Sequence, residues 1–387
     1  MKNGISRSWF DSKFSSTERF VVETIFRDSG SFLEIENVDE NDLLKYSGQN
    51  GVAGLLYKSL TGEQKSNFSE SFVSKLKNEY LKTLLFNTNL TNSAKHLNSL
   101  LRDNDIPVVF LKGILLSSFL YDELPLRPMS DIDLLVPKHL AKEAFDLIVS
   151  NGATLANPED KDHPANHHLP MLYFKGAPLE IHRLLIAELS SFYIPPEDVF
   201  KNSIVWSNNS FNLPGPSYTH TFIYMSVHVY NTFRQGGIRL SWMADFVYFS
   251  KRERVDVESD DFRYWVELWK VGYPVEFILA ITNLLMGKEE VFFGGRSDSK
   301  LAQDISMAIE FFRISADKKS SYSYRIIWEQ IKNAKGIRQK YDIVESKIFR
   351  REERGGVVVR LFKLIGRFAG MIFNTLEINV RRVFGRY

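Results

Sequence analysis

Hydrophobic residues recur at helical spacing through the first 105 residues of the chain, with few β-branched runs among them. The clearest series precedes a polar turn at Arg102 and consists of Leu81, Leu84, Leu85, Leu90, Leu97 and Leu101. Apolar residues with this spacing line one face of a helix. The pattern therefore predicts a helical N-terminal region over residues 1–105.

The periodicity changes at residue 106, where short continuous apolar runs typical of buried strands replace the helical spacing. The apolar runs predict strands at residues 106–111 and 131–136, and two further strands are predicted at residues 171–175 and 179–185. A helix-like stretch follows each of the first two, and a turn at Gly176 between the last two predicts a hairpin. We expect an α+β protein, in which a mixed sheet core is flanked by N-terminal and C-terminal helical regions.

Helical periodicity returns after about residue 217 and gives the chain four predicted parts. They are a helical region over 1–105, an α/β core over 106–205, a helical domain over 206–345 and a basic amphipathic C-terminal helix over 346–387. Residues 347–387 contain ten Lys or Arg residues and three Glu residues, which gives them a local charge of +7. Because the net charge of the chain is +2, the preceding residues carry −5. The broad apolar face of this last helix predicts contact with its own protein, a second subunit or an anionic membrane surface.

Composition removes several classes of site. Cysteine is absent, which excludes disulfide scaffolds, thiolate metal sites and cysteine nucleophiles. No apolar run is long enough for a signal peptide or a membrane span, so the chain is expected to be cytoplasmic, with peripheral membrane contact through its C-terminal helix as an option. The core carries no strong positive charge, which argues against long nucleic acid as a partner.

Carboxylates on two predicted strands form the candidate chemistry. Asp131 and Asp133 alternate with aliphatic residues, so both side chains point to one face of their strand. Like charges held this closely are unfavourable unless a proton or a cation separates them, and oxygen ligands suit Mg²⁺ or Mn²⁺. Glu180 adds a third carboxylate on a later strand, and Gly113 allows a phosphate to approach the turn after the first strand. A half-exposed strand with a polar face remains the structural alternative.

The order of these motifs resembles the DNA polymerase β-like nucleotidyltransferase superfamily, and in particular its uncharacterised bacterial branch. The resemblance covers residues 105–250 and rests on segments 110–114, 127–136 and 179–182. It implies that Asp131 and Asp133 bind the metal ions, that Glu180 completes the catalytic site, and that Gly113 with its helix binds the triphosphate. Ser130 belongs to the same motif and is expected at the nucleotide.

Ile114 departs from the superfamily pattern, because Ser or Gly usually follows the glycine. The spacing from Gly113 to the acidic strand is also long, so Lys112 or Arg127 is expected to neutralise phosphate charge. Outside the core motif, Arg234 and Arg239 are phosphate candidates. Substrate-contacting or supporting candidates are His182, His228 and Asp245, and the loop histidines His163, His167 and His168 favour a solvated or substrate-contacting loop over a metal site.

The leading hypothesis is a metal-dependent nucleotidyltransferase that moves a nucleoside monophosphate from a nucleoside triphosphate, such as ATP, to an acceptor hydroxyl and releases pyrophosphate. Small molecules, peptides and proteins all remain open as acceptors. The alternative, favoured by Ile114, is a catalytically silent binding or scaffold protein in a biosynthetic assembly. Transfer of a γ-phosphoryl group is the third reading.

Overall fold

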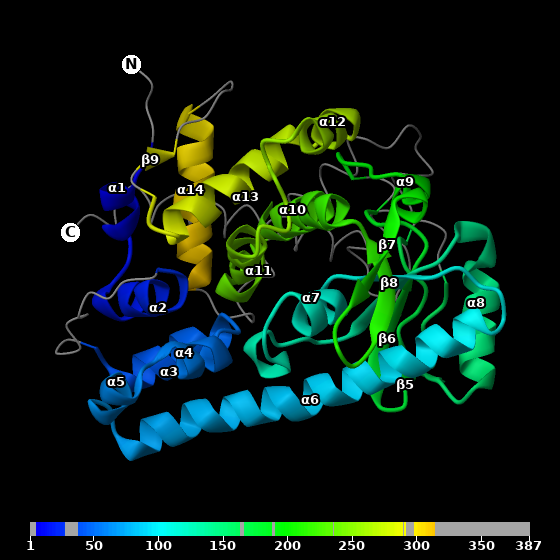
Figure 1. Ribbon diagram of the computed structural model, residues 1–387, viewed down its shortest axis with the longest axis horizontal. Helices are drawn as coiled ribbons and strands as arrows, with labels where there is room; N and C mark the ends of the chain where they lie inside the picture. The colour runs from blue at the N-terminus through cyan, green and yellow to red at the C-terminus, as the bar shows by residue number, and fades with distance from the viewer. Residues whose placement is uncertain are drawn as a thin grey trace, which may run out of the picture. The chain divides into compact units, whose positions relative to one another are not determined.

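The structure is a computed structural model that describes residues 5–27, 38–162, 166–187, 190–234, 236–288, 290–291 and 298–313 (Figure 1). The chain divides into two units, of which the larger comprises residues 1–188, 192–231 and 238–314. The smaller comprises residues 189–191, 232–237 and 315–387. The predicted C-terminal helix over 346–387 lies outside the described residues. The sheet and the helices that pack on it belong to the larger unit.

Helices fill the described part of the N-terminal region, as its spacing predicts (Figure 1). They are α1 (Arg7–Asp11), α2 (Ser16–Phe26), α3 (Glu40–Gln49), α4 (Ala53–Ser59), α5 (Gly62–Ser66) and α6 (Glu70–Arg102). Ser69 fixes the start of α6, because its hydroxyl accepts a hydrogen bond from the backbone N–H of Phe72. The helical character expected before the sheet is thereby confirmed for the described residues.

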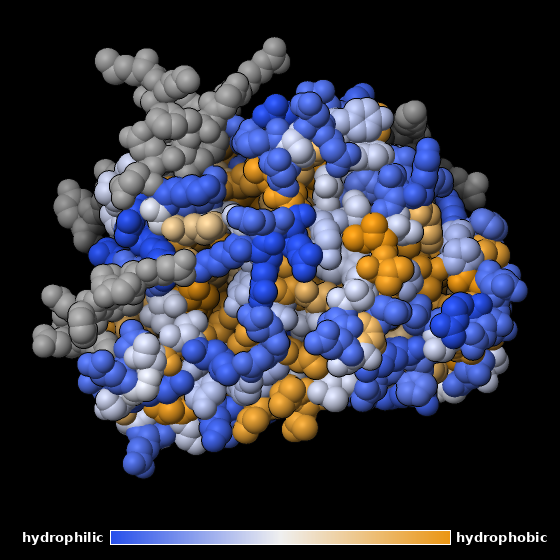
Figure 2. Space-filling view, viewed as in Figure 1, coloured by the Kyte–Doolittle hydropathy of each residue, from blue (hydrophilic) through white to orange (hydrophobic). Residues whose placement is uncertain are grey.

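The apolar series predicted on α6 divides between core and surface. Leu90, Leu97 and Leu101 are fully buried, in the half of the helix that packs on the sheet and on α8 (Ala141–Ser150). Leu81 and Leu85 are instead 41% and 73% exposed, and Figure 2 shows apolar side chains on the surface along this helix. The leucine spacing identified the helix correctly, but the buried face of α6 is formed by Phe72, Leu76, Leu90, Leu97 and Leu101, and Leu81 and Leu85 lie outside it.

A five-stranded mixed sheet forms the centre of the larger unit. Its spatial order is β2 (Val109–Leu111), β3 (Ile132–Leu135), β6 (Ala177–His182), β5 (Leu172–Phe174) and β4 (Thr154–Leu155). The pair of β3 and β6 is parallel and the other pairs are antiparallel, including the predicted hairpin of β5 and β6. Ile132, Leu134, Leu179 and Ile181 are fully buried. The mixed sheet expected from the sequence is therefore present.

A buried amide on α6 fixes the segment that leads into β3. The side-chain amide of Asn87 donates to the carbonyl oxygens of Leu124 and Arg127 at 2.6 and 2.9 Å, and its oxygen accepts from the Met129 N–H at 3.3 Å. This segment contains the 3₁₀ turn η2 (Leu124–Leu126). Because the irregular backbone is hydrogen-bonded to a long helix, the start of β3 has a fixed position.

The remaining described elements lie around this core. They are α7 (Gly113–Phe119), η3 (Lys138–Leu140), α9 (Pro196–Lys201), the antiparallel pair of β7 (Ser203–Ser207) and β8 (Asn212–Pro216), α10 (Tyr218–Arg234), α11 (Leu240–Lys251), α12 (Asp260–Leu268), α13 (Gly272–Leu285), α14 (Asp298–Phe312), and the short pair of β1 (Ile5–Ser6) and β9 (Glu290–Val291). The sequence did not predict the hairpin of β7 and β8, which crosses the expected boundary at residue 205. Within the described residues, no helix combines the length and the apolar character needed to cross a bilayer.

Candidate active site

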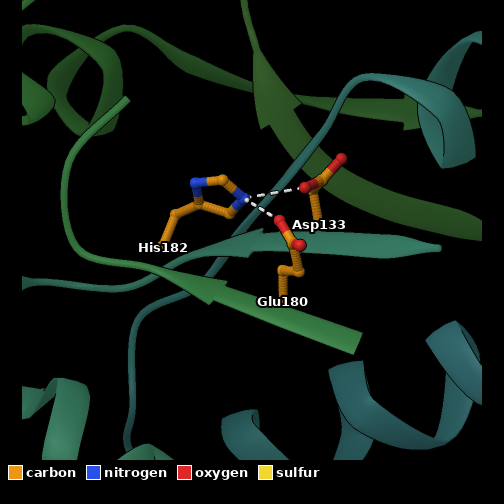
Figure 3. Close-up of side chains that lie close together, drawn as sticks. All are labelled: Asp133, Glu180 and His182. Carbon is orange, nitrogen blue, oxygen red and sulfur yellow. Dashed lines mark hydrogen bonds and ion pairs between the residues drawn. The ribbon is translucent and has the colours of Figure 1, made fainter. Parts of the chain in front are cut away.

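The parallel pairing of β3 with β6 brings the acidic motifs together. Asp133 lies opposite Glu180 in the register, and His182 follows two residues later on the same face of β6. The Nε2 atom of His182 lies 2.7 Å from Asp133 Oδ1 and 3.5 Å from Glu180 Oε2 (Figure 3). Residues from distant parts of the sequence thus converge at one place on the sheet.

These donor atoms fit a divalent cation. One ligand atom from each of Asp133, Glu180 and His182 lies within 4.8 Å of the other two. Ligands about 2.1 Å from an ion at neighbouring octahedral positions lie about 3 Å apart, a value between the two measured separations. Carboxylate oxygens suit Mg²⁺ and Mn²⁺, and an imidazole nitrogen is a ligand for transition metals. The cluster is therefore a candidate metal centre, and it includes a histidine that the sequence placed only in a supporting role.

Asp131 lies just before β3 and outside that group of three. It is half-buried, and its Oδ1 accepts a hydrogen bond of 2.9 Å from the hydroxyl of Ser130. Burial, together with the nearby Asp133 carboxylate, raises the pKa of Asp131 from 3.8 to about 6. Asp131 and Asp133 are therefore electrostatically coupled, although only Asp133 belongs to the group with Glu180 and His182.

Lys112 joins the cluster from the turn between β2 and α7. Its ammonium donates to Asp133 Oδ1 at 3.2 Å, and the two side chains are 17% and 4% exposed. Its backbone has φ 48° and ψ −121°, in a region that non-glycine residues rarely adopt. Burial by itself would raise the pKa of Asp133, but Lys112 and the hydrogen bond from His182 lower it below its usual range. Asp133 is therefore held as a buried carboxylate between the Lys112 ammonium and the His182 imidazole.

Arg127 is engaged in a second buried ion pair. Its guanidinium donates to both carboxylate oxygens of Asp245 on α11, at 3.0 to 3.3 Å, and the Tyr121 hydroxyl donates to the same carboxylate at 2.9 Å. A side chain at Gly113 would place a Cβ only 2.7 Å from Arg127 Nη1. Glycine at this turn thus makes room for the arginine, a requirement that the sequence does not reveal.

Four further side chains lie near the cluster. The ring centroids of His167 and His168 lie 5.3 and 5.7 Å from that of His182, and His168 forms an isolated bridge with His182. On α10, Tyr224 and His228 interact electrostatically with the Lys112 ammonium. Burial is the main cause that lowers the pKa of His167 to about 2 and that of His228 to about 3.

The sequence predicts a solvated or substrate-contacting loop for His167 and His168, and the structure places both half-buried beside His182. The sequence analysis does not identify Tyr224, although this residue precedes His228 by one helical turn. Helical spacing of four residues is the signal that would have found it. His163 lies outside the described residues.

Two polar atoms at the cluster lack a hydrogen bond of normal geometry within the described part of the chain. They are the Nδ1 atom of His182 and the hydroxyl oxygen of Tyr224, and both are buried. Buried polar atoms are nearly always paired in folded proteins. Their presence beside the carboxylates marks this cluster as a place for a polar ligand or water.

The arginines predicted farther along the chain lie at the end of α10 and at the start of α11. Arg239 is exposed and caps α11, where its guanidinium lies 5.6 Å from the centre of the Trp242 ring. Arg234 is half-buried at the end of α10 and belongs to the smaller unit. Their assignment to phosphate stays a prediction.

Comparison with known proteins identifies the family. A family described as an uncharacterised nucleotidyltransferase matches residues 36–287, which is more than half of the chain. The chain therefore belongs to this family, in agreement with the resemblance drawn from its motifs. No curated protein matches it.

Proposed function

We propose that this member of the uncharacterised nucleotidyltransferase family transfers a nucleoside monophosphate from a nucleoside triphosphate to an acceptor hydroxyl, with release of pyrophosphate. The observation that carries the proposal is the parallel pairing of Asp133 with Glu180, with Asp131 at the entrance to the same strand. Carboxylates on two neighbouring strands are suited to hold the metal ions of a phosphoryl-transfer site, and this supports the proposal.

Asp131, Asp133 and Glu180 would hold Mg²⁺ or Mn²⁺, with His182 within reach as a further ligand. Such an ion supplies charge neutralisation at the phosphate that is attacked. Glu180 is half-buried and is the carboxylate suited to accept the proton of the acceptor hydroxyl. Asp133 stays ionised because Lys112 and His182 stabilise its charge.

Lys112, Gly113 and Ser130 form the turn and strand entrance where the triphosphate would bind. Arg127 acts as a positioning residue, because the guanidinium that Asp245 holds packs against Gly113 and so supports the turn that contains Gly113. His228, Arg234 and Arg239 remain proposed contacts to the nucleotide or the acceptor.

A second candidate function is nucleotide binding without transfer. Ile114 is fully buried in α7, so it contributes to the core and supplies no hydroxyl to a phosphate. A silent family member would bind a nucleotide at the cluster and release no pyrophosphate. The nearly neutral chain charge argues against long nucleic acid as the acceptor, and small molecules, peptides and proteins stay as proposed acceptors.

Isotope position separates these functions. The purified protein is incubated with Mn²⁺ or Mg²⁺, a total extract of its source cells, and ATP labelled at either the α- or the γ-phosphorus. Nucleotidyl transfer predicts that the α label moves to an acceptor and that Asp133→Asn abolishes this transfer while the protein stays folded. Movement of the γ label to the acceptor instead of into pyrophosphate, or α transfer above that of the extract alone that survives Asp133→Asn, would refute the proposal. The same assay is run with each of the other nucleoside triphosphates.

A further inference from the structure

We propose that Lys112 is an exchangeable counterion, which neutralises the carboxylate cluster when no metal is bound and turns to the triphosphate when a metal–nucleotide complex binds. The inference rests on the proposed function and adds a coupling between its two ligands. It predicts that a divalent ion binds weakly alone and tightly together with a nucleotide.

The first argument is that Lys112 and a metal compete for the same oxygen. The Lys112 ammonium and the His182 imidazole both contact Asp133 Oδ1, at 3.2 and 2.7 Å. The same oxygen therefore contacts His182 Nε2, a donor atom of the candidate metal centre. A divalent ion placed there would meet a buried ammonium, and like charges in a buried site repel strongly. Metal binding therefore requires Lys112 to leave Asp133.

The second argument concerns what Lys112 would then contact. A buried ammonium without a partner is costly, so its release from Asp133 needs another anion within reach. A triphosphate supplies that anion and accepts strong charge-assisted hydrogen bonds. Without the nucleotide, the metal must bear the cost of the displaced lysine alone.

The third argument is that the neighbouring cation is not available for this role. Arg127 lies against Gly113, but its guanidinium is bound to both oxygens of Asp245, and Nη1 is 3.4 Å from the carbonyl oxygen of Pro128. Lys112, by contrast, contacts Asp133 through a single amine, on a backbone held at a positive φ angle. A lysine on a flexible stem can exchange partners more readily than a bidentate arginine.

Because coupling between two ligands is reciprocal, the nucleotide must raise the affinity for metal by the same factor as the metal raises the affinity for nucleotide. The exchange of Lys112 between Asp133 and the triphosphate would weaken binding of a divalent ion alone to the carboxylate cluster. The metal–nucleotide complex would then be the species that binds.

The test measures Mn²⁺ alone, from the spin-resonance signal of the free ion, for wild type and Lys112→Met. Removing the competing ammonium should lower the dissociation constant for Mn²⁺ by about tenfold or more, since a nearby charge shifts the ligand affinity of a buried carboxylate by at least this factor. With a nonhydrolysable nucleoside triphosphate present, Lys112→Met should lose about tenfold in affinity for the metal–nucleotide complex.

Lys175→Met is the matched control, because Lys175 also has a positive φ angle, of 50°, but is exposed at the turn between β5 and β6. It should bind Mn²⁺ like wild type. Circular dichroism confirms folding, and Lys112→Gln replaces Lys112→Met if the latter does not fold. An unchanged or weaker affinity for Mn²⁺ alone in a folded Lys112 variant overturns the counterion role, even if wild type binds nucleotide. A wild type that binds Mn²⁺ and no metal–nucleotide complex contradicts the proposed function instead.

Discussion

Two buried ion pairs flank the turn at Gly113, and they differ in how fully their polar atoms are satisfied. In the pair of Arg127 with Asp245, both carboxylate oxygens accept hydrogen bonds, and the Tyr121 hydroxyl adds another. In the pair of Lys112 with Asp133, one carboxylate oxygen accepts two donors. Beside this second pair, polar atoms of His182 and Tyr224 remain buried without a normal hydrogen bond.

The difference teaches how to separate a structural ion pair from a functional one in the same fold. A saturated network holds one geometry and stabilises the packing around it. An incompletely satisfied cluster that carries several carboxylates retains affinity for a ligand, and sites of this kind are where perturbed pKa values gather. The Arg127 pair is therefore expected to control stability, and the Lys112 cluster is expected to control binding and chemistry.

The largest expected effect on stability is at Asp245. In Asp245→Asn, the buried Arg127 guanidinium loses its counterion, and breaking a buried pair in this way costs about 3–5 kcal/mol. Urea unfolding measures the loss. Asp122→Asn is the matched control, because Asp122 pairs with Arg252 at the surface, where such a pair contributes at most about 1 kcal/mol. Equal losses in the two variants would contradict the structural role of the buried pair.

A smaller effect is expected at Gly113. In Gly113→Ala, the new Cβ would lie 2.7 Å from Arg127 Nη1, and Arg127 cannot move away without breaking its contacts with Asp245. Overpacking of this kind costs about 1–3 kcal/mol. Gly48→Ala on α3 is the control, since no atom lies within 4 Å of its Cβ position. If both substitutions leave the free energy of unfolding unchanged, the close approach of Arg127 does not constrain this turn.

The smallest effect is a pH dependence at Asp131. Its pKa rises from 3.8 to about 6 in the folded protein, because it is buried beside Asp133. The folded state then binds the proton more tightly than the unfolded state, so this contribution to stability is complete below about pH 4 and is lost as the pH rises through about 6.

Asp131→Asn removes this titration. Urea unfolding in metal-free buffer, in small steps between about pH 4 and pH 6, should show wild type losing stability relative to the variant as the pH rises. Asp146→Asn at an exposed position of α8 serves as the control and should follow wild type. Parallel curves for wild type and Asp131→Asn would show that Asp131 is not coupled to the buried cluster.

The sequence predicted those parts of the fold that depend on local periodicity. The strand at residues 109–111 lies in a continuous apolar run, and the strands that carry Asp133 and Glu180 alternate acidic and aliphatic residues; both patterns indicate a strand. The hairpin of β7 and β8 was not predicted, because its second strand contains Pro214, Gly215 and Pro216, and proline and glycine are rare inside strands. Gly215 is required there, since a Cβ would lie 2.6 to 2.7 Å from side-chain atoms of Leu115 and Trp206.

The candidate site was predictable to a similar extent. Alternation along each strand placed Asp133 and Glu180 on polar faces, and the structure pairs them. The ion pair of Arg127 with Asp245 joins residues 118 positions apart, and a local sequence pattern cannot predict such a contact. The same holds for the approach of Lys112 to Asp133, which depends on an uncommon backbone conformation at the turn.

The central claim is that the carboxylate cluster binds a metal–nucleotide complex. Thermal unfolding of wild type and Asp133→Asn, with each nucleoside triphosphate and with or without Mg²⁺ or Mn²⁺, tests it without knowledge of the acceptor. A ligand at about one hundred times its dissociation constant stabilises the folded state by roughly 2.7 kcal/mol. We predict a metal-dependent rise in the unfolding temperature of wild type that is lost in Asp133→Asn. The absence of any shift in folded wild type, or the same shift in both proteins, would contradict the claim.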